Sequence, residues 1–112
     1  MIQIMPAAKK DKRLTGKQKR HLRSLGHHLK PLVMLGREGI TDNVIKAAAA
    51  ILEAHELLKV KIGHGCLLER QEAAEVIAAR TGSEIVQVLG KTFLVFKANH
   101  ERSDEHRIKL PV

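Results

Sequence analysis

The sequence predicts a two-layer α/β domain with a four-stranded mixed sheet and the element order α-β-α-β-α-β-β. Three observations support this fold class. Apolar residues recur at helical spacing in three segments and at strand spacing or in short runs in four others. The chain has 112 residues, a common length for one domain, and 44% of them are hydrophobic, which is enough for a packed core. Glycine or proline separates several of the segments, and no internal repeat divides the chain.

The first helix is predicted from Thr15 to about residue 27. Thr15 is a suitable N-cap, and Gln18 three residues later completes a capping box. Leu22, Leu25 and Leu29 form a narrow apolar stripe that we expect to pack on the rest of the domain. The basic residues of this region project away from that stripe and form a cationic ridge: Lys17, Lys19, Arg20, Arg23 and Lys30.

A short strand and a second helix come next. Pro31 prevents further helix, and the apolar run 32–35 is typical of a short buried strand. Thr41 is the expected N-cap of a helix that runs to about Ala54 with one apolar face.

The segment 58–62 is the second predicted strand. Its apolar residues alternate with Lys59 and Lys61, so we expect one buried face and one wet, basic face. Because a helix separates this strand from the first, the two strands should be parallel, with a right-handed crossover.

The remaining elements are a third helix and a hairpin. The helix is expected over residues 68–80, and Gly82 follows where a left-handed residue is needed. Residues 85–89 and 92–97 are rich in β-formers, and Gly90-Lys91 between them predicts a hairpin turn.

The net charge of +8 is concentrated at the start of the chain. Residues 1–30 hold nine basic residues and one acid, whereas the other 82 residues hold eleven of each. A localised cationic patch favours a polyanion partner, nucleic acid before anionic lipid, over a role in solubility alone. We expect residues 1–13 to be a flexible basic arm, residues 14–112 to be a single domain, and the charged tail from Asn99 to be loose as far as residue 108.

Composition excludes several classes of function. Aromatic residues are only Phe93 and Phe96, which argues against a surface built on aromatic stacking. Cys66 is the single cysteine, so there is no intrachain disulfide or multi-cysteine zinc site, and a reducing cytoplasm is expected. No apolar run approaches the ~18 residues of a membrane helix, and the short apolar start of the chain does not have the order of a secretory signal.

One motif has the spacing of a phosphate-contacting loop. Gly36-Arg37-Glu38-Gly39 joins a predicted strand to a helix N-terminus, and such a G-x-x-G loop can hold a sugar–phosphate backbone. A plain tight turn is the alternative for this motif taken alone. Gly90-Lys91-Thr92 lacks the earlier glycine of a nucleotide-binding P-loop. His64 and Cys66 lack a third ligand nearby, and no catalytic arrangement has supporting context, so we expect no metal, no cofactor and no enzymatic activity.

Several segments together resemble the CRM domain in its stand-alone bacterial form, the YhbY-like proteins. The resembling segments are residues 15–23, 29–33, 35–41, 55–61, 86–92 and 108–111. The resemblance implies an RNA-binding protein with the fold of the C-terminal domain of translation initiation factor three. It also implies association with precursors of the large ribosomal subunit, with RNA contacted by residues 36–39 and the basic surface. Glu38 departs from what a phosphate-binding loop would prefer.

The expected partner is therefore RNA, most simply ribosomal RNA, with no DNA specificity, no membrane and a monomeric protein. The residues expected to bind RNA are Lys17, Lys19, Arg20, Arg23, Lys30, Gly36, Arg37, Glu38, Gly39, Lys59, Lys61 and Lys91. The alternative is a protein-interaction adaptor whose basic end contacts an acidic partner.

Overall fold

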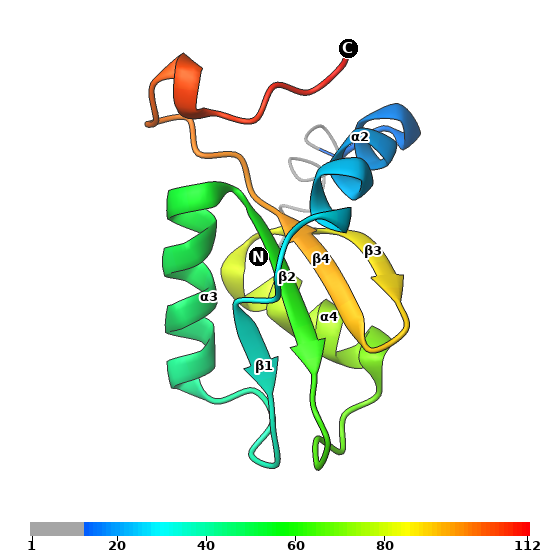
Figure 1. Cartoon of the computed structure of the whole chain (residues 1–112). Helices are drawn as coiled ribbons and strands as arrows, with labels where there is room; N and C mark the ends of the chain where they lie inside the picture. Colours follow the sequence, from blue (N-terminus) through cyan, green and yellow to red (C-terminus); the bar gives the residue numbers. More distant parts are fainter. Residues whose placement is uncertain (1–12) are drawn as a thin grey trace, which may run out of the picture.

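The structure is a computed structural model that describes residues 13–112. Its sheet has the order β1-β2-β4-β3, with β1 and β2 parallel and with β4 antiparallel to both β2 and β3 (Figure 1). The predicted mixed four-stranded sheet and the predicted order of elements are confirmed. The elements are α2 (Gly16–His27), β1 (Val33–Leu35), α3 (Asp42–His55), β2 (Leu57–Ile62), α4 (Arg70–Thr81), β3 (Glu84–Leu89), β4 (Thr92–Phe96) and a 3₁₀ turn, η1 (Asp104–His106).

Local signals determine most of the element ends. The Thr15–Gln18 capping box is present, and Thr41 caps α3 by accepting a hydrogen bond from the Val44 amide at 3.2 Å. The helix α4 begins two residues later than predicted, because the Glu69 carboxylate accepts from the Gln71 amide and makes Glu69 the N-cap. Gly82 ends α4 in the left-handed conformation, with φ of 73°.

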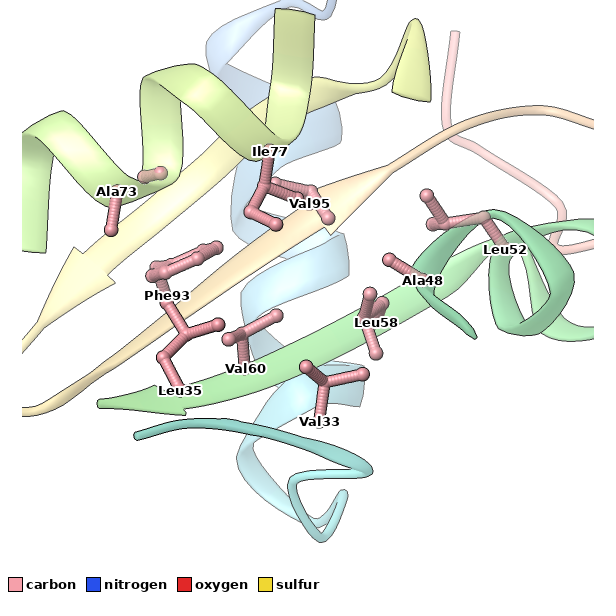
Figure 2. Packing of buried hydrophobic residues seen from close by; sticks show 11 residues of the cluster. Val33, Leu35, Ala48, Leu52, Leu58, Val60, Ala73, Ile77, Phe93 and Val95 are labelled. Carbon is pink, nitrogen blue, oxygen red and sulfur yellow. The ribbon is translucent and has the colours of Figure 1, made fainter. Parts of the chain in front are cut away.

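The main core lies between the sheet and the helices α3 and α4. Phe93 and Val60 are among its fully buried side chains, together with Leu52 and Ile77 from the two helices. Figure 2 shows these side chains gathered between the strands and the two helices. The alanines of the helices, such as Ala73, let the helix backbones approach the sheet closely.

The opposite face of the sheet carries α2 and the C-terminal segment, so the two predicted layers have a partial third layer. A second core forms there around Leu22 of α2 and Leu57, Leu94 and Phe96 of the sheet. The predicted wet, basic face of β2 is exposed at Lys61 but only half-exposed at Lys59. The strand also begins one residue earlier than predicted, at Leu57, which is buried beneath this cover.

The predicted apolar stripe on α2 is only partly buried. Leu22 is fully buried, but Leu25 and Leu29 are each 39% exposed. Gly26 takes the expected place of a second buried leucine, because α2 lies against Leu94 so closely that a Cβ at residue 26 would come within 2.4 Å of that side chain. The stripe was inferred from spacing alone, and spacing does not reveal how near the helix approaches the sheet.

The tail from Asn99 is held in place, contrary to the expectation that it is loose. The Glu56 carboxylate, which has no exposed surface, accepts hydrogen bonds from the Asn99 amide at 2.6 Å and the Ile108 amide at 2.7 Å. The Arg107 guanidinium lies 3.6 Å from the same carboxylate. Ile108 and Leu110 then pack against the second core. One buried acid therefore attaches the C-terminal segment to the domain.

Residues 1–12 of the predicted basic arm lie outside the described residues. Across the part of the chain that is described, no helix is long and apolar enough to cross a membrane.

Candidate nucleic-acid interface

The face of the sheet toward α2 is open at the ends of the strands farthest from the second core. The strand register places Met34, Lys61, Thr92 and Leu89 side by side, one from each strand. We call these four residues the open row. Met34 and Leu89 are 62% and 64% exposed, and Lys61 is exposed between them. The open row therefore offers both apolar surface and positive charge to a partner.

The next row toward α2 is half covered. It contains Lys59, Leu94 and Gln87, which pair in register across β2, β4 and β3. Lys59 and Gln87 are half-buried, whereas Leu94 is buried beneath α2. This row forms the floor of a groove that begins where the helix ends its contact with the sheet.

One side of α2 forms the wall of that groove. Arg20, Arg23 and His27 lie at spacings of three and four residues, so they share one side of the helix. With Lys59, Gln87 and Thr92 they line a groove of about 360 Å³, which we call the cationic groove. Three positive side chains from two separate elements thus face the same space.

Several contacts hold α2 over the sheet. The Leu14 amide donates to the Glu84 carboxylate of β3 at 2.9 Å, and the Gln18 side chain donates to the Pro111 carbonyl at 3.1 Å. The close contact of Gly26 with Leu94 brings the helix backbone down onto β4. These contacts hold α2 beside the cationic groove.

The G-x-x-G loop follows β1 at the same end of the sheet as the open row. The Gly39 amide donates to the Gly36 carbonyl at 3.0 Å, and Gly39 has a φ of 69°. This positive φ favours glycine at residue 39. Gly36 has open space where a Cβ would stand, and Arg37 and Glu38 are exposed. Figure 1 shows the loops after β1 and β2 together at the lower end of the sheet, away from α2.

Lys91 belongs to that same end. The Ile62 amide at the end of β2 donates to the Lys91 carbonyl at 2.7 Å, and the Gly63 amide donates to the Leu35 carbonyl at 2.9 Å. These two bonds tie the hairpin turn and the start of the β2–α4 loop to the strand ends that border the G-x-x-G loop.

The structure thus divides the predicted residues into groups. Arg20, Arg23 and Lys59 meet at the cationic groove. Lys61 and Lys91 lie at the same end of the sheet as the G-x-x-G loop, residues 36–39. Lys30 lies elsewhere, beside a second groove whose walls include Leu25 and Leu29. The α2 residues Lys17 and Lys19 do not line either groove.

None of the predicted basic residues is recorded in an ion pair within the described chain. The two ion pairs of the described residues are Arg80 with Asp42 and Arg107 with Glu56, and none of these four side chains lines either groove. The helix α2 contains no acidic residue, so its positive charge is uncompensated along its own length. Among the described residues, no group of three or more histidine, cysteine or acidic residues is arranged to hold a metal ion.

Sequence reasoning missed the polar and apolar parts of this surface. Gln87, Thr92, Met34 and Leu89 were not expected to contribute, because their grouping depends on the strand register. The only signal in the sequence was that successive side chains of a strand point to opposite faces of the sheet. This alternation assigns each residue to a face, but it does not show which part of that face other elements leave uncovered.

The comparisons with known proteins agree on one family. A model of the CRS1 / YhbY (CRM) domain matches residues 14–97. The chain is 42% identical, over 88% of its length and 99% of the relative, to a Bacillus subtilis protein named probable RNA-binding protein YqeI. It is 36% identical to a Haemophilus influenzae protein named RNA-binding protein, over 88% of this chain and 95% of that one.

A solved structure supports the same grouping. The solution structure of the protein SAV1595 from Staphylococcus aureus matches with a TM-score of 0.72 and 39% sequence identity, over 88% of this chain and all of that one. The family model covers the capped helix α2, the G-x-x-G loop and all four strands. The chain belongs to the CRS1 / YhbY (CRM) domain family.

Proposed function

We propose that this protein binds RNA through the α2-facing side of its sheet, and that its target is ribosomal RNA in precursors of the large ribosomal subunit. The observation that carries the proposal is the convergence of Arg20, Arg23 and Lys59 on one groove. Relatives that match most of this chain are named as RNA-binding proteins, which supports the same partner.

Electrostatics favour a phosphate backbone as the ligand of this surface. Arginine and lysine that neutralise phosphates release bound counterions, and this release supplies a large part of the affinity. The basic residues of α2 have no recorded carboxylate partner among the described residues, so they need not give up an ion pair to meet a phosphate.

In this proposal the G-x-x-G loop is a second contact with the backbone. Gly36 leaves space for close approach, and Arg37 projects from the same loop as an exposed cation. Lys61 lies between Met34 of β1 and Thr92 of β4, and Lys91 lies in the turn at the same end of the sheet. Contacts of this kind position the RNA without reading its sequence.

The direct test is the salt dependence of RNA binding. Replacing both Arg20 and Arg23 by alanine should weaken binding to every RNA sequence and reduce the slope of log K against log salt by roughly 1.4 to 1.8, from the two lost phosphate contacts. The matched control is the double variant Lys46→Ala, Arg80→Ala, which removes the same charge from the exposed surfaces of α3 and α4. Equal slopes for the two double variants would contradict the proposed interface.

The ribosomal target needs a separate experiment. We expect the protein to sediment with large-subunit precursors, to leave them after treatment with ribonuclease, and to crosslink to ribosomal RNA. If the protein stayed bound to the precursors after ribonuclease treatment, the result would instead favour the alternative function, a protein-interaction adaptor.

A further inference from the structure

We infer that the cationic groove is a site for one unpaired nucleotide of the bound RNA, with the base inside the groove and its phosphate at the arginines. This inference rests on the proposed function and specifies the chemical class of the RNA as single-stranded at this point.

The shape of the groove favours a single nucleotide. Its volume of about 360 Å³ falls within the range of ~300–1,000 Å³ that is usual for small-molecule sites. It lies along the side of α2, above β3 and β4, so a flat group can lie on the strands beside the helix. A base inside a double helix has its faces covered by its neighbours, and such a base cannot enter without leaving the stack.

The side chains that line the groove suit the parts of a nucleotide. Leu89, which is 64% exposed, provides an apolar surface for a base. Gln87 is half-buried on the floor, and among the described residues no hydrogen bond to its side-chain amide is recorded. An amide carries both donors and an acceptor, so it can pair with the edge of a base.

Arg20 and Arg23 supply the charge for the phosphate. A guanidinium plane can also stack on a base, a contact that aromatic residues provide in other RNA-binding domains. The chain has no tyrosine or tryptophan, and its two phenylalanines are buried, so the arginines, the His27 imidazole and Leu89 are the groups available here for contact with a base face.

The neighbouring groove lacks this combination. It is lined mainly by aliphatic side chains, including Leu25, Leu29 and Leu32, and it has no side-chain amide. Of these two grooves, only the one beside Gln87 combines apolar surface, cations and a side-chain amide, and for this reason we assign the nucleotide to it.

The first experiment compares a short unpaired RNA with the same strand annealed to its complement. The full-length protein should bind the unpaired strand more tightly at equal salt, by about tenfold. Equal or tighter binding of the duplex would overturn the assignment of an unpaired nucleotide.

The second experiment removes the amide without changing charge. Gln87→Met should weaken binding of the unpaired strand by roughly three- to tenfold, the effect of losing one or two hydrogen bonds, and leave duplex binding and the salt slope unchanged. Gln71→Met, at an exposed glutamine of α4, is the matched control and should have no effect. Wild-type affinity in a folded Gln87→Met variant would overturn the inference.

Leu89→Ala serves as an independent variant, because Leu89 is exposed and its truncation should not disturb folding. It should weaken binding of the unpaired strand, and an unchanged affinity would argue against a base on this surface. A reduced salt slope in the Arg20, Arg23 variant together with no effect at Gln87 or Leu89 would refute only the nucleotide site. No effect in any of these variants would refute the proposed function as well.

Discussion

The face of the sheet under α3 and α4 and the face toward α2 are built from the same four strands, yet they bury their side chains to different extents. The first is closed along its length by a continuous core that includes Phe93, Val60 and Ile77. The second is closed only where Leu22 of α2 and the C-terminal segment cover it, and Met34 and Leu89 remain open at the other end.

The difference shows how one small sheet serves two purposes. A closed apolar face supplies most of the stability, because buried apolar area is the main favourable term in folding. The half-closed face is where Lys59 and Lys61 can combine with the cations of α2. Mutations on the two faces should therefore separate stability from RNA binding.

The largest expected effect is on the closed face. Phe93→Ala should lower the free energy of unfolding by about 3–5 kcal/mol, through lost burial and the cavity left behind. Met34→Ala on the open row should change it by less than about 0.5 kcal/mol. Urea unfolding followed by circular dichroism measures both values, and similar losses for the two variants would contradict the division between the faces.

Glu56 tests the attachment of the C-terminal segment to the half-closed face. Glu56→Ala should cost about 3 kcal/mol, because two tail amides and the Arg107 guanidinium lose their buried partner. It should also speed proteolysis between residues 99 and 107. Glu53→Ala, at an exposed acid of the same helix, is the control and should do neither.

Variants of the G-x-x-G loop test whether the open end of the half-closed face contacts RNA. Gly36→Asp adds a negative charge in open space and should weaken RNA binding by about 1–2 kcal/mol, while Arg37→Ala should weaken it less. Glu38→Lys should strengthen binding more than Glu72→Lys, which makes the same charge change on α4. Titration of a labelled RNA measures all four variants. Equal effects of the two lysine variants would show that the loop is only a turn.

The smallest expected effect comes from the basic arm. Deleting residues 1–12 removes three lysines and one aspartate, and should weaken RNA binding by roughly two- to tenfold. The melting temperature should stay the same, because the deletion leaves the bond between Leu14 and Glu84 and the described core clusters intact. A large fall in melting temperature would contradict the predicted domain boundary.

The sequence was most informative where the controlling contacts are local. The Thr15 capping box, the Thr41 cap and the left-handed Gly82 all depend on residues within a few positions, and all are confirmed. The burial of Leu25 and the looseness of the tail were predicted wrongly. Both depend on contacts between distant residues, such as Glu56 with Ile108.

The candidate site follows the same pattern. The cations of α2 were visible in the sequence because charge is countable along the chain. Their meeting with Lys59 and Gln87 was not, because it depends on where α2 crosses the sheet and on the register of β3 with β4, which has an irregularity between Ile85 and Gln87. Neither of these can be read from periodicity.

The most direct test of the central claim is an amide NMR titration of the full-length protein with unpaired RNA. We expect the largest shift changes at Lys59, Lys61, Gln87 and Leu89, with further changes along the Arg20 side of α2. The exposed alanines of α3, such as Ala49, should remain unchanged, because they lie on the outer surface of a helix that covers the other face of the sheet. Shift changes that centre on α3 and α4 and spare the cationic groove would contradict the account.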